Sequence, residues 1–274
     1  MKFPDPIQMV QDSGVPGDSH LGRVLAAELR RVTDTTAAAG RRALGRQEAG
    51  RFELALRRAR EKRGGAVIGE FKLASPSLGA FAPKVTLEAQ LESYQVGGVD
   101  CFSVLAEPQF FHGSAAHVRR AARFLVPVLY KGFVLSPLHL HEAADSDAAA
   151  VLLIARVLRG HTALFAEAAR ALGLEPLIEL HGLDEAPYAQ EAEARLVGLN
   201  ARDLATFTVR ESPAAPLREL FPRAVLIRES GVRTPAAARA AFAAGFDAVL
   251  IGEALMRSAN QRRFLQDIFA PLPL

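Results

Sequence analysis

The chain has 274 residues, of which half are hydrophobic and 23% are charged, and its formal net charge at pH 7 is +3. This mixture supplies enough apolar residues for a full core and excludes an intrinsically disordered chain. No apolar run approaches the roughly 20 residues that span a bilayer, and no apolar segment of signal-peptide length lies near the N-terminus, so we expect a soluble, cytoplasmic protein that binds no membrane.

The N-terminal region, up to about Gly64, has a polar and helical pattern. The segments LGRVLAAELRRV and QEAGRFELALRRAREK place apolar residues three and four positions apart, as on one face of a helix. Arginines are concentrated from Arg41 to Arg63 and again from Arg119 to Arg123, which raises the alternative of nucleic-acid contact. Glutamate and alanine interleave with them at helical spacing, without a series of aromatic stacking partners. We therefore favour solvated helix faces and expect no nucleic-acid partner.

After Gly64 the pattern changes to short runs rich in valine, isoleucine and leucine. The single cysteine, Cys101, lies in one of them with neither metal-ligand nor redox spacing around it, so we expect a buried thiol. Helical stretches such as TLEAQLESYQVGG, HTALFAEAARALG and TPAAARAAFAAG separate most of the runs and end near a glycine, which suits a helix C-terminus. The eight runs occupy residues 66–71, 101–105, 126–130, 150–154, 176–180, 196–200, 224–229 and 248–252.

The spacing of these runs predicts the fold. They recur about every 26 residues, which is the scale of one β-strand plus one return helix. An open, doubly wound sheet is the competing arrangement, but it usually has fewer strands and a glycine-rich first turn, whereas the first turn here reads FKLASPSLG and lacks GxGxxG. We predict an α/β protein with a (β/α)8 TIM barrel at residues 65–274. An N-terminal helical extension, residues 1–64, is expected to pack on it within one structural domain.

Polar side chains end several of the predicted strands. Active sites of this barrel lie at the C-terminal ends of the strands, so these side chains are candidates for acid, base or phosphate chemistry. Each one alone is equally well explained as an exposed charge or as half of a structural ion pair. As a group they indicate a site, because burying unpaired charges is costly for a fold. The group consists of Glu70, Lys72, Lys131, Glu179, Asn200, Arg202, Glu229 and Ser230.

The last two predicted strands run into ESGVRTP (229–235) and IGEALM (251–256), each with a glycine where the chain turns toward a helix. Backbone N–H groups at such a turn, together with the positive end of a helix dipole, suit a phosphate dianion. These two loops are the customary phosphate site of this barrel class, so we expect a small phosphorylated molecule as substrate.

In their order and spacing, eight segments resemble the motifs of the indole-3-glycerol phosphate synthase family. They run from about Val67 to Ala259 and read GEFKLASPSLG, SVLAEPQFFHGS, VLYKGF, VLLIARVL, LIELHGLDE, GLNARDLATF, RESGVRTP and AVLIGEALM. The resemblance implies a carbon–carbon lyase of tryptophan biosynthesis. Such an enzyme closes the pyrrole ring of 1-(2-carboxyphenylamino)-1-deoxyribulose 5-phosphate, releases CO2 and then eliminates water. The resemblance implies no metal, no cofactor and no redox step.

The resemblance also implies roles for four charged residues. Lys131 would be the general acid that protonates the ketone, and Glu179 would remove a proton during dehydration. Lys72 would contact the substrate carboxylate and serve as a second acid, while Glu70 would pair with a lysine and stabilise the cationic intermediate. Loss of hydration in an apolar mouth lowers the pKa of an ammonium, and a neighbouring carboxylate opposes that shift, so we expect the pKa of Lys131 to be tunable.

The remaining motif residues would bind the substrate. Phe111 and Phe133 would flank its anthranilate ring, although packing in the core explains either phenylalanine equally well. The residues expected to position the substrate are Asn200, Arg202, Glu229, Ser230 and Ser75. The residues expected at its phosphate are Ser75, Gly231, Gly252 and Glu253.

Four positions depart from the family pattern. Gly132 stands where an aspartate normally follows the lysine, which removes a carboxylate from the edge of the site. Neighbouring residues of a strand point to opposite sides, so that aspartate need not contact the substrate and instead suits an anchor for the strand end. Leu73 stands where a basic residue is common, Ala106 where threonine is common and Tyr130 where arginine is common. These changes bear on rate, substrate preference and loop order more than on the fold.

Two other functions remain open from the sequence. One is a divergent paralogue that binds a phosphorylated ligand without turnover, which would be expected to lack the acid or the base. The other is a phosphosugar isomerase or aldolase, in which a Schiff-base lysine would replace the acid. The basic helices offer no obvious apolar seam for a dimer, so we expect a monomer, with a weak homodimer as the alternative.

Overall fold

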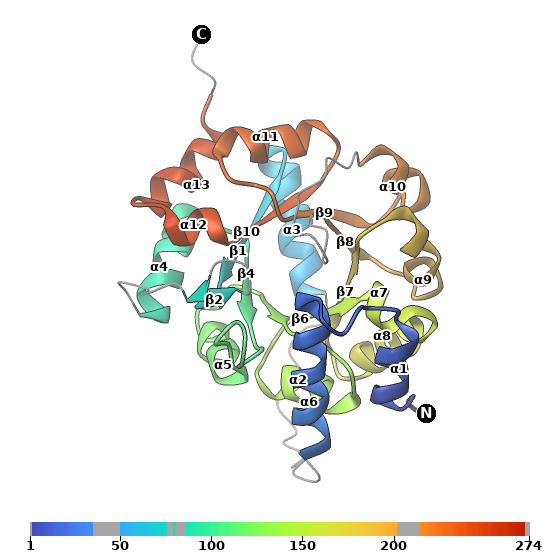
Figure 1. Cartoon of the computed structure of the whole chain (residues 1–274). Helices are drawn as coiled ribbons and strands as arrows, with labels where there is room; N and C mark the ends of the chain where they lie inside the picture. Colours follow the sequence, from blue (N-terminus) through green and yellow to red (C-terminus); the bar gives the residue numbers. More distant parts are fainter. Residues whose placement is uncertain (1, 35–49, 76–78, 81–85, 202–213, 272–274) are drawn as a thin grey trace.

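The computed structural model describes residues 2–34, 50–75, 79–80, 86–201 and 214–271. Eight parallel strands close into a barrel in the order β1-β10-β9-β8-β7-β6-β5-β4, with helices around it (Figure 1), which confirms the predicted (β/α)8 TIM barrel. The barrel strands are β1 (Ala66–Phe71), β4 (Cys101–Leu105), β5 (Val128–Lys131), β6 (Ala150–Ile154), β7 (Glu175–Leu180), β8 (Leu196–Asn200), β9 (Val225–Glu229) and β10 (Ala248–Ile251). The short strands β2 (Ala74–Ser75) and β3 (Gly79–Ala80) pair antiparallel after β1.

The helices largely follow the sequence pattern. Polar N-caps begin several of them: the side chains of Thr86, Ser114, Ser136, Thr234 and Asn260 each accept a hydrogen bond from a backbone N–H of the first turn. The helices are α1 (Pro6–Asp12), α2 (His20–Asp34), α3 (Arg51–Arg63), α4 (Leu87–Gly97), α5 (Ala115–Ala122), α6 (Pro137–Asp145), α7 (Ala155–Leu158), α8 (Thr162–Ala171), α9 (Ala186–Glu191), α10 (Ala215–Leu220), α11 (Pro235–Ala243), α12 (Glu253–Arg257) and α13 (Gln261–Phe269), with single 3-10 turns η1 (Arg159–His161) and η2 (Leu183–Glu185). None of the helices described here is long and apolar enough to cross a membrane.

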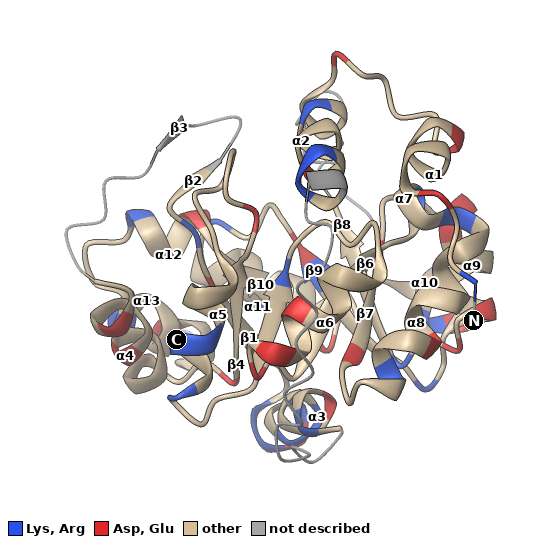
Figure 2. Cartoon of the chain, turned by 90° about the horizontal axis from the view of Figure 1, so that it is seen from below, with Lys and Arg blue, Asp and Glu red and all other residues tan. Residues whose placement is uncertain are grey.

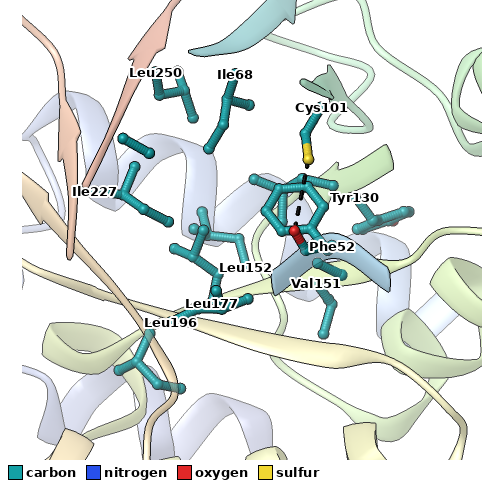
Figure 3. Packing of buried hydrophobic residues seen from close by; sticks show 14 of the residues in the cluster. Phe52, Ile68, Cys101, Tyr130, Val151, Leu152, Leu177, Leu196, Ile227 and Leu250 are labelled. Atoms are coloured by element: carbon teal, nitrogen blue, oxygen red, sulfur yellow. Dashed lines mark hydrogen bonds between the residues drawn. The ribbon is translucent and has the colours of Figure 1, made fainter. Parts of the chain in front are cut away.

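The strands are apolar almost throughout because the barrel buries both of their faces. Figure 3 shows Ile68, Leu152, Leu177, Ile227 and Leu250 among the buried residues of the cluster, and each of them is at most 6% exposed. Cys101 is fully buried, as expected, and its Sγ lies 3.8 Å from the carbonyl oxygen of Phe52. The barrel therefore has a packed interior, and functional side chains can be exposed only at its ends.

The register of the strands aligns their C-terminal ends. Lys131 is the last residue of β5 and pairs with Leu105, the last residue of β4. At the far side of the barrel Asn200, the last residue of β8, pairs with Glu229, the last residue of β9. The run expected at 126–130 is thus shifted toward the C-terminus, and Lys131 belongs to the strand itself. Parallel pairing places these ends in one ring.

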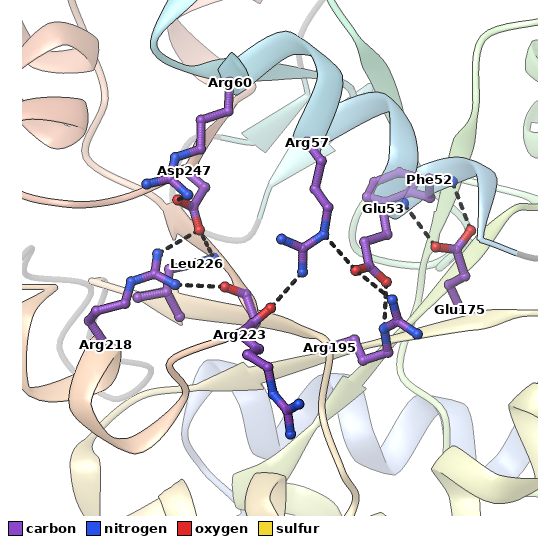
Figure 4. A network of polar contacts seen from close by, with 11 residues as sticks. Phe52, Glu53, Arg57, Arg60, Glu175, Arg195, Arg218, Arg223, Leu226 and Asp247 are labelled. Atoms are coloured by element: carbon purple, nitrogen blue, oxygen red, sulfur yellow. Dashed lines mark hydrogen bonds and ion pairs between the residues drawn. The ribbon is translucent and has the colours of Figure 1, made fainter.

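Helix α3 closes the opposite, N-terminal end of the barrel. The backbone N–H groups of Phe52 and Glu53 donate to the carboxylate of Glu175, the first residue of β7, at 2.7 and 2.8 Å. Arg60 pairs with Asp247, just before β10, at 2.8 Å (Figure 4). Figure 2 shows α3 at one end of the molecule, with α2 and β2 at the other. This part of the N-terminal region therefore caps the end of the barrel that lies away from the strand C-termini.

Candidate active site

A cavity of about 180 Å³ opens at the C-terminal ends of the strands. All of the residues that the sequence predicts for the site contribute to its lining, with two exceptions. Arg202 lies outside the described residues, and the described part of Ser75 is its backbone in β2. The predicted residues that line the cavity are Glu70, Lys72, Phe111, Lys131, Phe133, Glu179, Asn200, Glu229, Ser230, Gly231, Gly252 and Glu253.

Lys131 lies between two carboxylates that come from different strands. Its Nζ is 3.5 Å from Glu179 Oε2, and it donates a hydrogen bond to Glu229 Oε2. The side chains of both glutamates are nearly inaccessible, at 4% and 1%, and that of Lys131 is 14% exposed. Burial lowers the pKa of Lys131, but the charges of Glu229, Glu179 and Glu70 outweigh it, so the pKa is raised overall. Lys131 is therefore an ammonium at neutral pH.

The two carboxyl groups at Lys131 differ in their affinity for a proton. Burial raises the pKa of Glu229 to about 8, since the charge of Lys131 only partly offsets burial and the neighbouring charge of Glu179 adds to it. For Glu179, burial also raises the pKa, but Lys131 and His181 more than compensate, and hydrogen bonds from Glu229 and Asn200 contribute. Its pKa is lowered. Two adjacent carboxyl groups with separated pKa values provide one base and one neutral donor.

A second ion pair lies at the end of β1. Lys72 Nζ is 3.4 Å from Glu70 Oε1, and Ser103 on the adjacent strand β4 donates to Glu70 Oε2 at 3.5 Å. A Cβ atom at Gly252 would lie 2.4 Å from Glu70 Oε1. The sequence suggested Gly252 for phosphate binding alone, but its missing side chain also makes room for this carboxylate.

Glycine makes room for a second carboxylate on the other side of the barrel. A Cβ atom at Gly198, on β8, would lie 2.2 Å from Glu229 Oε1. Sequence reasoning missed Gly198, although the glycine inside the strand LVGLN indicates a close approach by another group. Glu70 and Glu229 are thus each accommodated by a glycine on the neighbouring strand or just after it.

The turn after β9 brings together a polar pair. Ser230 Oγ donates to Asn200 Oδ1 at 2.7 Å. Ser230 and Gly231 both have positive φ values, 63° and 78°. A left-handed serine is strained, and such strain is typical of functional turns. Arg233 in the same loop also lines the cavity, and sequence reasoning did not single it out.

The aromatic side of the cavity is held in place by a buried acid. Phe111 and Phe133 lie with ring centroids 6.1 Å apart at an interplanar angle of 33°. The carboxylate of Glu107, which is 1% exposed, accepts hydrogen bonds from the backbone N–H groups of Gln109, Phe110 and Phe111. Glu107 therefore fixes the loop that carries Phe111. Sequence reasoning missed this residue, for which an acid at the start of the loop EPQFF is the available signal.

The ring of Tyr130 occupies the space that a side chain at position 132 would need. A Cβ atom at Gly132 would lie 2.6 Å from Tyr130 Cε1, and Tyr130 is almost completely buried. Burial raises the pKa of Tyr130, and the charge of Glu142 on α6 adds to the shift. The tyrosine thus lies against α6, outside the barrel, while the neighbouring Lys131 lines the cavity. The departures from the family pattern at 130 and 132 belong to one packing arrangement.

The family model described as indole-3-glycerol phosphate synthase matches residues 22–268. An indole-3-glycerol phosphate synthase from Kineococcus radiotolerans is 40% identical over 213 residues, which cover 77% of this chain and 78% of the relative. One from Carboxydothermus hydrogenoformans is 37% identical over 229 residues, which cover 80% of this chain and 86% of the relative.

A comparison with solved structures supports the fold alone. A thiamine phosphate pyrophosphorylase from Pyrococcus furiosus superposes with a TM-score of 0.53 and 14% sequence identity, covering 76% of this chain and 95% of that protein. At this level of identity the likeness is one of architecture and carries no information about substrate.

Proposed function

The chain belongs to the indole-3-glycerol phosphate synthase family, and from this premise we propose how its cavity carries out the family's reaction. The protein is a carboxy-lyase of tryptophan biosynthesis that acts on a small phosphorylated substrate. It converts 1-(2-carboxyphenylamino)-1-deoxyribulose 5-phosphate to indole-3-glycerol phosphate. The residue roles that follow are our proposal.

Lys131 is the proposed acid of ring closure. The ring carbon that bears the carboxylate attacks the ketone carbon, and the ketone oxygen takes a proton from Lys131 Nζ. The bond to the carboxylate then breaks, CO2 leaves, and its electron pair restores the aromatic ring. The surrounding carboxylates support this role because they raise the pKa of Lys131 and keep it protonated, and they also stabilise the cationic intermediate.

Glu179 is the proposed base of dehydration. It removes a proton while the hydroxyl formed in the first step leaves as water, with Lys72 as the second acid. Its lowered pKa supports this role, because a base must be ionised at the working pH. Glu229, whose pKa is raised to about 8, is mostly neutral at pH 7 and suits a hydrogen-bond donor to the substrate.

The rest of the cavity is proposed to orient the substrate. Lys72 would contact the substrate carboxylate, with Glu70 holding its ammonium at 3.4 Å. Phe111 and Phe133 would flank the anthranilate ring. The substrate would be positioned by Asn200, Arg202, Glu229 and Ser230, and its phosphate would be held by Ser75, Gly231, Gly252 and Glu253.

The organisation of the chain adds three proposals. Residues 1–64 would be a helical extension packed on the barrel of residues 65–274 in one structural domain. The contact between Glu28 and His139 at 2.9 Å, and the ion pairs of α3, support this packing. We also propose that the enzyme works in the cytoplasm as a monomer, with a weak homodimer as the alternative.

The observation that carries the mechanism is the ammonium of Lys131 held between two buried carboxyl groups inside the cavity. The test is an assay of the purified protein with the carboxyphenylamino-deoxyribulose phosphate, following indole fluorescence. We expect turnover without added metal or cofactor. Trapping of the substrate by borohydride at Lys131 would contradict the acid role, because it would require a Schiff base at that lysine.

A further inference from the structure

A buried histidine lies between the proposed base and a second carboxylate. His181 follows β7, and its Nε2 is 3.3 Å from Glu179 Oε1. On the other side of the ring, its Nδ1 is 3.8 Å from Glu185 Oε2. The three side chains are between 3% and 5% exposed. Both ring nitrogens therefore face carboxylate oxygens away from solvent, at contact distances that do not yet have hydrogen-bond geometry.

The second carboxylate is itself fixed. Glu185 Oε1 accepts from Arg156 Nε at 2.6 Å, and its Oε2 accepts from the backbone N–H of His181 at 2.9 Å. Arg156 lies on α7, which follows β6, so two consecutive β–α units hold Glu185. The result is a continuous chain of contacts, Arg156 to Glu185 to His181 to Glu179, that leads from a partly exposed arginine to the cavity.

The protonation state of the imidazole ring determines which of the two carboxylates it can donate to. Ionised carboxylates are acceptors only, and a neutral imidazole has one donor nitrogen and one acceptor nitrogen. A neutral ring could therefore donate to Glu179 or to Glu185, but not to both. A protonated ring donates from both nitrogens, and Glu185, with Arg156 behind it, is placed to hold that ring in orientation.

From this geometry we propose that His181 is a positioning residue, which holds the carboxylate of Glu179 in place through its Nε2. The inference rests on the role proposed above for Glu179. It adds to the reaction a chain of residues outside the cavity lining, in which Glu185 orients His181 and His181 orients the base.

The charged groups around the base are consistent with this role. Lys131 from β5 and His181 from β7 both lower the pKa of Glu179 against the effect of burial. Glu229 from β9 also contacts Glu179 and carries its proton up to a pH of about 8. Lys131 and His181 are thus the two basic side chains next to Glu179 among the described residues, and removing His181 leaves only one.

A second buried histidine provides a matched control. His139 on α6 is 1% exposed, and its Nε2 pairs with Glu28 on α2 at 2.9 Å. Its Nδ1 accepts from the backbone N–H of Leu135 at 3.3 Å. It is thus equally buried and also paired with a glutamate, but it joins two helices and does not line the cavity.

The test compares His181→Gln, His181→Ala and the control His139→Gln in the full-length protein. Two quantities are measured between pH 3 and 9: kcat with the carboxyphenylamino-deoxyribulose phosphate, and the carbon-13 NMR titration of the Glu179 carboxyl group, assigned by comparison with Glu179→Gln. A neighbouring charge shifts a carboxyl pKa by about one unit or more. For His181→Ala we therefore expect the Glu179 titration and the acid limb of kcat to move up by about one pH unit.

The rate effect follows from that shift. Below the pKa, a rise of one unit leaves about a tenfold smaller ionised fraction, so kcat of His181→Ala should fall about tenfold at low pH and recover toward high pH. His181→Gln keeps a donor without the charge, so it should show the same shift with better orientation and a higher plateau. Glu185→Gln leaves both groups in place and should shift the titration in the same direction by less.

The outcomes separate this inference from the function it rests on. If Glu179→Gln turns over at the normal rate, Glu179 is not the base, and both proposals are wrong. If Glu179→Gln is inactive but the His181 variants keep the original pH profile and Glu179 titration, losing only thermal stability as His139→Gln does, His181 is structural and this inference alone is wrong. The Gln variant and Glu185→Gln keep the test decisive if His181→Ala does not fold.

Discussion

The two ends of the barrel use charge in opposite ways. At the N-terminal end, buried carboxylates meet more than one arginine: Glu53 pairs with Arg57 at 2.7 Å and Arg195 at 2.8 Å, and Asp247 pairs with Arg60 and Arg218 (Figure 4). Around Lys131, at the C-terminal end, the ratio is inverted, since one ammonium is shared by two carboxyl groups. Cations in excess stabilise the first end, and carboxylates in excess create reactive groups at the second.

Exposure explains the difference. The arginines at the N-terminal end keep much of their hydration, with side chains 31% exposed for Arg218 and 52% for Arg60, so their pairs cost little to form. Lys131 and its partners are almost completely buried, so each charge there shifts the pKa of its neighbours. Buried carboxylates therefore indicate stability where donors surround them and function where donors are too few.

The largest expected effect comes from removing the shared ammonium. Lys131→Ala should lower kcat by about a hundredfold or more, which is the usual contribution of one general acid. The measurement is steady-state kinetics by indole fluorescence, with circular dichroism to show that the fold is retained. An unchanged kcat would remove Lys131 from the mechanism and, with it, the functional half of the comparison.

The matched change at the opposite end should affect stability alone. Asp247→Asn keeps the shape of the side chain but removes the charge that meets Arg60 and Arg218, and it replaces the oxygen that accepts from the backbone N–H of Leu226 at 2.7 Å. We expect the free energy of unfolding to fall by about 2 kcal/mol, as for the loss of hydrogen bonds to a charged group. Denaturant unfolding measures it, and kcat should stay the same. A loss of kcat without a loss of stability would contradict the separation of the two ends.

A smaller effect is expected at the edge of the site. From the sequence, an aspartate at position 132 is expected to change turnover with little change of fold. The contact of 2.6 Å between a Cβ at this position and Tyr130 changes that expectation, because the buried ring must move. We expect Gly132→Asp to lower the free energy of unfolding by about 1–3 kcal/mol, as other overpacked sites do. With Tyr130→Ala in the same chain, the combined loss should be smaller than the sum of the two single losses, because the alanine removes the clash. A fully stable single variant would contradict the steric coupling.

A separate effect is a pH dependence of stability. The pKa of Glu229 is about 8 in the folded protein, against an ordinary value of 4.5. Between these values the folded state holds a proton that the unfolded state has released, so this group lowers the stability as the pH rises from about 5 to about 8. Glu229→Gln removes this titration. Its Tm relative to the unaltered protein should therefore rise across that window and level off above it, and a constant Tm difference would show that Glu229 is ionised throughout.

Much of the fold and of the site was predictable from the sequence. The apolar runs are both long enough and regularly enough spaced for eight parallel strands, and parallel strands necessarily bring their C-terminal ends to one side. That is why Lys131, Glu179 and Glu229, which are far apart in the chain, could be assigned to one cavity. The sequence also predicted that glycines end the helices before β4, β7 and β10. In the structure Gly98, Gly173 and Gly245 stand there, all with positive φ values.

Only the tertiary structure decided which charges meet and which proton each group holds. The sequence left open whether burial would lower the pKa of Lys131 or neighbouring carboxylates would raise it. The closed barrel brings the ends of strands β5, β7 and β9 together, so the carboxylates prevail. The same closure brings His181 against Glu179 and places Gly198 beside Glu229. Local pattern determines the face and the end on which a side chain lies, whereas pKa values depend on distances across the barrel that no single segment encodes.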